Sequence, residues 1–288
     1  MLDIEYLGNY PNGKETPWSN KCQGVTHDAE HWYITQTLQI WKIHASTDLN
    51  FSKKPASAQV LLLPDHLQAA GYDHFGDLDF WEGYLFISLE NKSKKIPPAI
   101  ALWDANNFEY CSNAVLPNLI KKDIPWCAIH PLEGTLFTSD FKCRGELYEY
   151  DFSISKDKQL ELKFLRTIFL KDKEGIPLNI KRVQGGVFSK KNKLFYLSSD
   201  GDKQGGIYVF ETEQFKLVEH IHVPYDPGFP NIHEVEGITL WDMDNLVING
   251  LEKSDKIKGQ LHLIILDNDL CNDDIYFKHF RVPVEKEK

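Results

Sequence analysis

VQGGVFS (183–189), LFYLSSD (194–200) and GIYVF (206–210) follow one another along the chain with only short polar or glycine-containing segments between them. Each is a short apolar run, rich in β-branched and aromatic residues and bounded by residues that favour turns, which is the pattern of a β-strand. The whole stretch therefore predicts three antiparallel strands joined by tight turns. A unit of this kind recurs along the chain.

The opening of this unit is a Gly, Ala or Asp followed by an apolar residue, and it occurs five times. The openings begin at residues 24, 77, 128, 186 and 237, so successive openings lie 51 to 58 residues apart. They are Gly24-Val25-Thr26, Asp77-Leu78-Asp79, Ala128-Ile129-His130, Gly186-Val187-Phe188 and Gly237-Ile238-Thr239. Such self-similarity at an even period indicates a repeat architecture.

Three further strands are expected after each opening. Second strands are expected at 32–35, 84–88, 135–139, 194–198 and 246–249, and third strands at 38–43, 99–103, 146–150, 206–210 and 260–266. Fourth strands, more polar in most copies and so suited to an outer position, are expected at 58–63, 114–116, 160–169, 216–223 and 275–282. Units of four antiparallel strands repeated every roughly 40–50 residues are typical of β-propeller blades. The sequence thus predicts an all-β, five-bladed propeller in one domain spanning 1–288.

The segment Leu2–Leu7 has the pattern of an additional outer strand. Pairing with the last blade would close the ring and remove an exposed strand edge. The predicted strand 275–282 competes for the same position, so the pattern leaves both ways of closing the ring open.

Composition limits the classes of partner. The chain has 32 Lys and Arg against 42 Asp and Glu, a net charge of −10, which disfavours binding to nucleic acid or to anionic lipid. No apolar run approaches the roughly 20 residues of a membrane helix, and residues 1–5 lack the pattern of a signal peptide. The five cysteines form no Cys-x-x-Cys pair. We therefore expect a soluble, cytoplasmic protein, and the sequence leaves its oligomeric state open.

The first strand of each propeller blade lines the central channel, so its polar residues converge on a shared mouth, the default ligand site. Gln23, His27, Trp126 and Gln184 are the predicted ligand-binding residues there. Trp126 is the candidate for stacking on a sugar or a flat ring, with core packing as the alternative. The acids Glu90, Asp140 and Asp200 follow the second strands at equivalent points, and this recurrence favours a structural role in turns.

Two of the openings resemble those of a known group of propellers. Gln23-Gly24-Val25 and Glu236-Gly237-Ile238 are similar to the polar-residue-then-Gly openings of the gluconolactonase, paraoxonase and strictosidine-synthase-like propellers. The resemblance implies that acid or amide side chains before such glycines hold a divalent cation, usually calcium, with Gln23, Gln184 and Glu236 at the ring positions. The chain departs from that group in having one carboxylate among these three residues and five blades where six are common.

The channel residues allow three kinds of chemistry. Calcium takes six to eight oxygen ligands in general, and Glu236 with Asp77 and Asp79 could supply three carboxylates. Imidazoles with a carboxylate could instead hold a transition metal, from the set His27, His74, His130 and His233. In the third case the polar groups bond to one another and to the backbone, and fix the register of the blades.

Three functions follow, and the fold alone does not choose among them. The first is binding of a small polar molecule or glycan at the channel mouth. The second is a metal-dependent hydrolase or lactonase, in which Glu236 holds the cation, the metal polarises a carbonyl, and His74 or His130 acts as the catalytic base. The third is a scaffold that binds protein partners on its rim.

Overall fold

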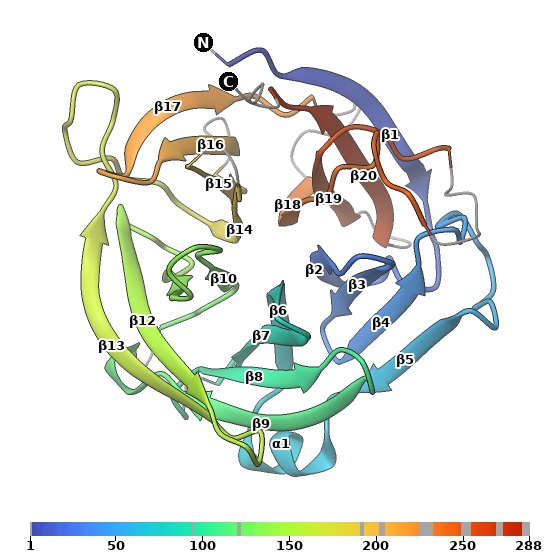
Figure 1. The fold of residues 1–288 in the computed structure, drawn as a ribbon, viewed down its shortest axis with the longest axis horizontal. Coiled ribbons are helices and arrows are strands. Elements are labelled where there is room, and N and C mark those ends of the chain that lie inside the picture. The colour runs from blue at the N-terminus through green and yellow to red at the C-terminus, as the bar shows by residue number, and fades with distance from the viewer. Residues whose placement is uncertain are drawn as a thin grey trace.

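The computed structural model describes residues 2–93, 95–119, 122–190, 193–201, 205–224, 233–248, 255–268 and 273–283. Within these residues the strands form five antiparallel sheets of four strands each, set around one axis (Figure 1). The structure is therefore the five-bladed β-propeller that the repeat predicts. No helix among the described residues is long and apolar enough to cross a membrane.

Four blades follow the chain from the inside outward. The first contains β2 (Cys22–His27), β3 (His31–Gln36), β4 (Gln39–His44) and β5 (Ala58–Leu62), and the second contains β6 (His74–Trp81), β7 (Tyr84–Glu90), β8 (Ala99–Asp104) and β9 (Glu109–Val115). The third contains β10 (Ala128–Ile129), β11 (Leu136–Thr138), β12 (Glu146–Ile154) and β13 (Leu160–Phe169), and the fourth β14 (Val183–Phe188), β15 (Leu194–Ser199), β16 (Gly206–Glu211) and β17 (Lys216–Ile221). The short helices α1 (Asp65–Ala70) and η1 (Pro117–Leu119) lie in connections.

The fifth blade differs from the strand assignment that the sequence suggests. Its inner strand β18 (His233–Leu240) pairs directly with β19 (Leu261–Asn268), which pairs with β20 (Asp273–Arg281). The prediction of a second strand at 246–249 is wrong for its described part, 246–248, and residue 249 lies outside the described residues. Leu246 packs against the core between the fifth and first blades and Val247 is 88% exposed, so this apolar run belongs to a covering loop.

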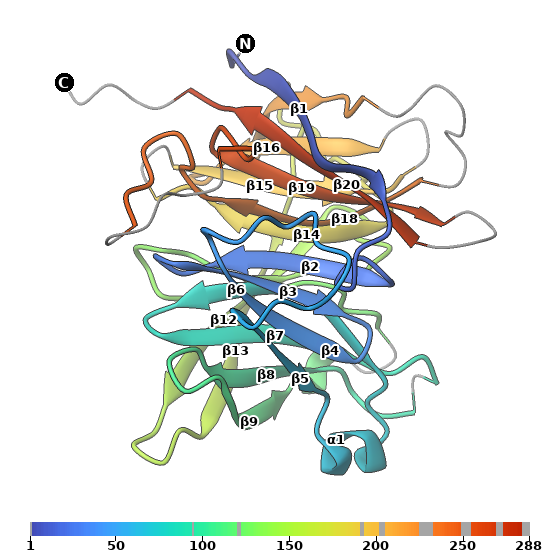
Figure 2. The ribbon, with the colours of Figure 1, turned by 90° about the vertical axis from the view of Figure 1, so that its right-hand side faces the viewer.

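The ring closes through the N-terminus. β1 (Glu5–Lys14) runs antiparallel to β20, from Glu5 opposite Arg281 to Lys14 opposite Ile275, and is the outer strand of the fifth blade. Figure 2 shows β1 lying along β20 on the outside of the blade. Of the two ways of closing the ring, the structure therefore has the N-terminal one, and the predicted outer strand 275–282 is the third strand.

Apolar side chains fill the spaces between neighbouring blades. Trp32 and Trp241 pack with Phe277 between the last and first blades, and Trp126 packs with Phe195 between the third and fourth. Full burial of a large apolar side chain stabilises a fold by roughly 1.5–3 kcal/mol. The core thus lies between the blades, and the inner strands are free to carry polar residues along the axis.

Candidate functional site

The inner strands carry polar residues at both of their ends, and the two ends line separate cavities. The first cavity, about 410 Å³, is lined by residues at or near the starts of inner strands, including Gln23, His74, Gln184 and Glu236. We call it the Glu236 cavity. The second, about 490 Å³, is lined by residues at the ends of inner strands and is called the Trp241 cavity.

Asp77 closes the axis between the two cavities. Its carboxylate is fully buried and accepts hydrogen bonds from the backbone N–H groups of Val25 (3.0 Å) and Ile238 (3.4 Å), on two other blades. Burial raises the pKa of Asp77 well above the usual range of an aspartate. A Cβ atom added at Gly24 or at Gly237 would lie 2.5 Å from its Oδ1 atom. Glycine at these openings therefore makes room for a carboxyl group that ties three blades together.

Glu236 is the unusual residue of the first cavity. Its side chain lines the cavity, the residue is 2% exposed, and its carboxyl group has no hydrogen-bond partner among the described residues. Burial, followed by the charges of Glu234, Asp200 and Asp77, raises its pKa well above the usual range of a glutamate. The raised pKa favours the uncharged carboxylic acid, which can both donate and accept a hydrogen bond.

Gln23 and His74 form a second polar element of this cavity. The Gln23 amide nitrogen donates to the carbonyl oxygen of Cys22 (3.0 Å), so its Oε1 atom accepts the hydrogen bond from His74 Nε2 (2.6 Å). The proton of the ring is thereby placed on Nε2, and Nδ1 is left without a partner among the described residues. Burial lowers the pKa of His74 to about 4, so the imidazole is neutral at neutral pH.

Gln184 lies on β14, beside Glu234 and Glu236 of the neighbouring inner strand β18. Its amide nitrogen donates to Glu234 Oε1 at 3.1 Å. The sequence analysis did not select Glu90, which also lines this cavity. Its counterpart Asp200 is structural, as its recurrence suggested, because it accepts from Val235 N–H (3.2 Å) and pairs with Arg182 (2.6 Å). Equivalent positions in the repeat therefore do not imply one role, because Glu90 lines the cavity whereas Asp200 is structural.

The remaining predicted residues lie away from the Glu236 cavity. His27 and Asp79 line the Trp241 cavity at the other end. His130 follows the end of β10, where its Nδ1 atom accepts from Glu133 N–H (3.1 Å) and its ring packs on Phe188. The structure thus separates the two histidines that were predicted as catalytic.

Trp126 belongs to the core. It is 0% exposed, its indole N–H donates to Ser139 Oγ (2.9 Å), and a Cβ atom added at Gly186 would lie 2.7 Å from its ring. Its ring offers no face to a ligand in the channel. Of the two roles considered for Trp126, the structure therefore shows core packing and not stacking on a ligand.

The residues do not fit the cation site that the resemblance implies. In the part of the chain that the structure describes, no three His, Cys, Asp or Glu side chains are arranged to hold a metal ion. Asp77 and Asp79 accept backbone hydrogen bonds, and Asp77 stands between Glu236 and Asp79. The four histidines are divided as well, with His233 beside Asp267 in the fifth blade (3.9 Å). We therefore derive no step through a metal.

Comparisons with known proteins support the fold. No family model and no curated protein matches the chain. Among solved structures, a luciferin-regenerating enzyme is similar over 97% of this chain and 95% of its own, with 13% identity and a TM-score of 0.53. A GH43_1 enzyme from Xanthomonas citri in complex with xylose is similar over 95% of this chain and 90% of its own, with 10% identity and a TM-score of 0.55. At such identities the likeness extends to the propeller fold and no further.

Proposed function

We propose that the protein binds a small, neutral, polyhydroxylated molecule of the carbohydrate class in the Glu236 cavity. The observation that carries the proposal is the carboxyl group of Glu236, which is buried, lines the cavity and lacks a partner among the described residues. The protein leaves the hydrogen-bonding capacity of this carboxyl group unused, whereas nearly all polar groups in protein interiors bond to protein, water or ligand. A ligand hydroxyl would satisfy this one.

The chemistry of the cavity favours a neutral ligand rich in hydroxyl groups. The raised pKa of Glu236 favours its uncharged form, which both donates and accepts a hydrogen bond, as a hydroxyl does. Gln184 adds an amide beside it. Acidic side chains outnumber the two lysines around the cavity, which disfavours an anionic ligand; the acids are Glu90, Asp123, Glu234, Glu236 and Asp273, and the lysines Lys21 and Lys92. The volume of about 410 Å³ is within the range of sites for small molecules.

Calorimetric titration tests the proposal, with xylose, glucose and inositol as probes. Xylose is included because one structurally similar enzyme is described in complex with it. Glu236→Leu, which removes both hydrogen-bonding functions at similar volume, should weaken binding about tenfold or more, since one well-made hydrogen bond to a buried group contributes about 1–3 kcal/mol. Glu236→Gln keeps a donor and an acceptor and is the matched control. Equal affinity of the Leu variant and the wild type would refute the proposal.

The metal-dependent hydrolase and the protein scaffold are weaker alternatives. The hydrolase requires a cation site, which the described carboxylates and histidines do not form. The scaffold requires a contact surface on the rim, for which we find no support in the described residues. Metal analysis before and after chelation, together with thermal unfolding, tests the hydrolase, which predicts bound metal and a loss of stability on chelation.

A further inference from the structure

The Trp241 cavity is separate from the proposed site and has a different character. It lies at the opposite ends of the inner strands, and Asp77 closes the axis between the two. Its walls include four large aromatic side chains, Phe80 and Trp81 from β6, Phe188 from β14, and Trp241 just after β18. The cavity holds about 490 Å³, within the range of sites for small molecules.

Asp79 is partly buried near the end of β6, and its side chain lines the cavity. The carboxylate accepts from the backbone N–H groups of Ile129 (2.7 Å) and Phe80 (2.8 Å) and from the hydroxyl of Thr26 (3.5 Å). A carboxylate has about four acceptor positions, so one remains. Among the described residues no Lys, Arg or His forms an ion pair with it. Burial raises the pKa of Asp79 to about 6, so it is mostly ionised at neutral pH. The cavity thus contains a partly buried carboxylate that forms no ion pair among the described residues, with the charge of Lys190 acting on it from a greater distance.

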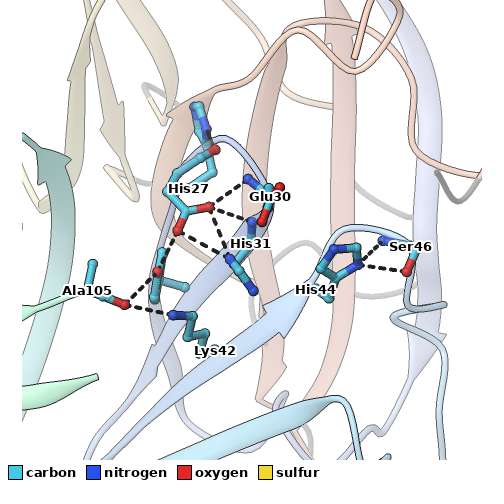
Figure 3. A network of polar contacts seen from close by, with 9 residues as sticks. His27, Glu30, His31, Lys42, His44, Ser46 and Ala105 are labelled. Carbon is cyan, nitrogen blue, oxygen red and sulfur yellow. Dashed lines mark hydrogen bonds and ion pairs between the residues drawn. The ribbon is translucent and has the colours of Figure 1, made fainter. Parts of the chain in front are cut away.

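The rim of the cavity is rigid and carries further negative charge. Asp28 accepts from the backbone N–H groups of Glu30 (2.7 Å) and His31 (2.6 Å) and from the hydroxyl of Tyr33 (2.6 Å), which holds the turn after β2. Figure 3 shows these contacts, with His31 beside the turn. The ring of His27 stacks on Trp241, with centroids 4.5 Å apart and planes at 3°.

Lys190 is the one lysine or arginine among the described residues that line the cavity, against Asp28, Asp79 and Asp242. Aromatic side chains, a partly buried carboxylate and an excess of acidic groups together suit a cation with an apolar body, because ring faces and carboxylates both attract positive charge. A neutral ligand would leave Asp79 without an ion pair, and an anion would be repelled by the three carboxylates. We propose that the Trp241 cavity is a second ligand site, which binds a small organic cation bearing an ammonium group on an aromatic or apolar body.

Three probes that share one ring and differ in charge test the proposal. We would titrate the full chain by calorimetry with 2-phenylethylammonium, 2-phenylethanol and 3-phenylpropionate. The ammonium compound should bind about tenfold or more tightly than the alcohol, a difference of about 1.4 kcal/mol, and the carboxylate should show no binding. Equal binding of the alcohol, tighter binding of the carboxylate, or no binding of the ammonium compound would overturn it.

Variants separate the site from general effects. Asp79→Asn keeps an oxygen for the Ile129 N–H group and removes the charge, and it should weaken binding of 2-phenylethylammonium about tenfold. Lys190→Gln changes an exposed residue, so folding is not at risk, and it should tighten binding because a like charge is removed. Lys193→Gln, an equally exposed lysine from the same connection, should leave affinity unchanged. If Asp79→Asn does not fold, the Lys190→Gln result decides, and weaker or unchanged binding in that variant contradicts the proposal.

Discussion

Asp77 and Gly237 meet on the axis of the propeller, where a Cβ atom on Gly237 would lie 2.5 Å from Asp77 Oδ1 and 2.5 Å from the Cα atom of Gly24. The contact joins the second, fifth and first blades at one point. Real Cβ atoms do not approach other atoms so closely, and backbone atoms cannot move aside as a flexible side chain can. The contact therefore makes glycine at position 237 a requirement of the closed ring.

Gly237→Ala should destabilise the protein by roughly 1–3 kcal/mol or more, because the added methyl group overpacks the axis. Urea unfolding followed by circular dichroism measures the change. Gly24→Ala faces the same carboxyl group and should have a similar effect. Unchanged stability in both variants would mean that the axis is less closely packed than the structure shows.

The sequence predicted the number of blades well because each blade repeats the same opening at an even spacing. It failed in the fifth blade, where Leu246 to Ile248 has the composition of a strand but packs as a loop over the neighbouring core. Pattern alone does not reveal whether a backbone segment finds a pairing partner. The sequence predicted the N-terminal segment as one of two candidates for the strand that closes the ring, because a segment near each terminus has the pattern of an outer strand.

The candidate site was predicted in part. Gln23 and His27 are four residues apart on one inner strand, and at about 3.3 Å per residue they lie some 13 Å apart, at opposite mouths. Both residues were predicted at a single mouth because the sequence pattern does not show that the two ends of an inner strand open to different cavities. Trp126 was misplaced for a related reason, since burial depends on which blade packs against the ring.

Glu236→Leu should also change stability. In the wild type the carboxyl group lines the cavity and forms no hydrogen bond among the described residues, so its replacement by an apolar group of similar size should stabilise the unliganded protein by about 1 kcal/mol. Loss of ligand binding with a gain in stability is typical of a binding residue, whereas a structural residue would lose stability. Urea unfolding without ligand measures the change, and a destabilised variant would contradict the assignment.

The raised pKa of Glu236 also predicts how the difference in stability between Glu236→Gln and the wild type varies with pH. The folded protein retains the proton of Glu236 at pH values where the unfolded chain has released it. This contribution to stability is fully present below the unfolded pKa, about 4.3, and is lost as the pH rises towards the folded pKa. Glu236→Gln does not titrate, so its stability relative to the wild type should rise as the pH increases from about 4.3 towards the folded pKa of Glu236. Urea unfolding at several pH values tests this, and a constant difference would contradict the raised pKa.

Buried histidines predict that the free energy of unfolding falls as the pH is lowered. His262 and His279 contact each other through their Nδ1 atoms at 2.8 Å, and burial lowers the pKa of His279 to about 4. A lowered pKa gives a stability that is fully present above the unfolded value, about 6.5, and is lost as the pH falls through the folded one. The free energy of unfolding should fall by up to about 1.4 kcal/mol per pH unit for each such histidine. Unfolding measured from about pH 7 down to pH 4 tests this, and a flat profile would contradict it.

Removal of residues 2–14 should open the ring. β1 supplies the outer strand of the fifth blade, and Leu2, Ile4 and Tyr10 pack against buried clusters. These three side chains are partly buried, so each contributes less than the roughly 1.5–3 kcal/mol of a fully buried one, and the truncated chain should lose roughly 3 kcal/mol in all. The freed edge of β20 would offer unpaired backbone groups to another chain, so we also expect association that increases with protein concentration.

Thermal unfolding and light scattering after size exclusion measure both consequences of the truncation. Glu5→Gln is the control for the truncation, because it removes the exposed ion pair with Arg281 and leaves the strand in place. Exposed ion pairs contribute little, so this variant should remain monodisperse and close to the wild type in stability. A truncated chain as stable and as monodisperse as the full one would show that the other four blades hold the ring closed without β1. In that case the N-terminal strand would cover the fifth blade without being needed to close the propeller.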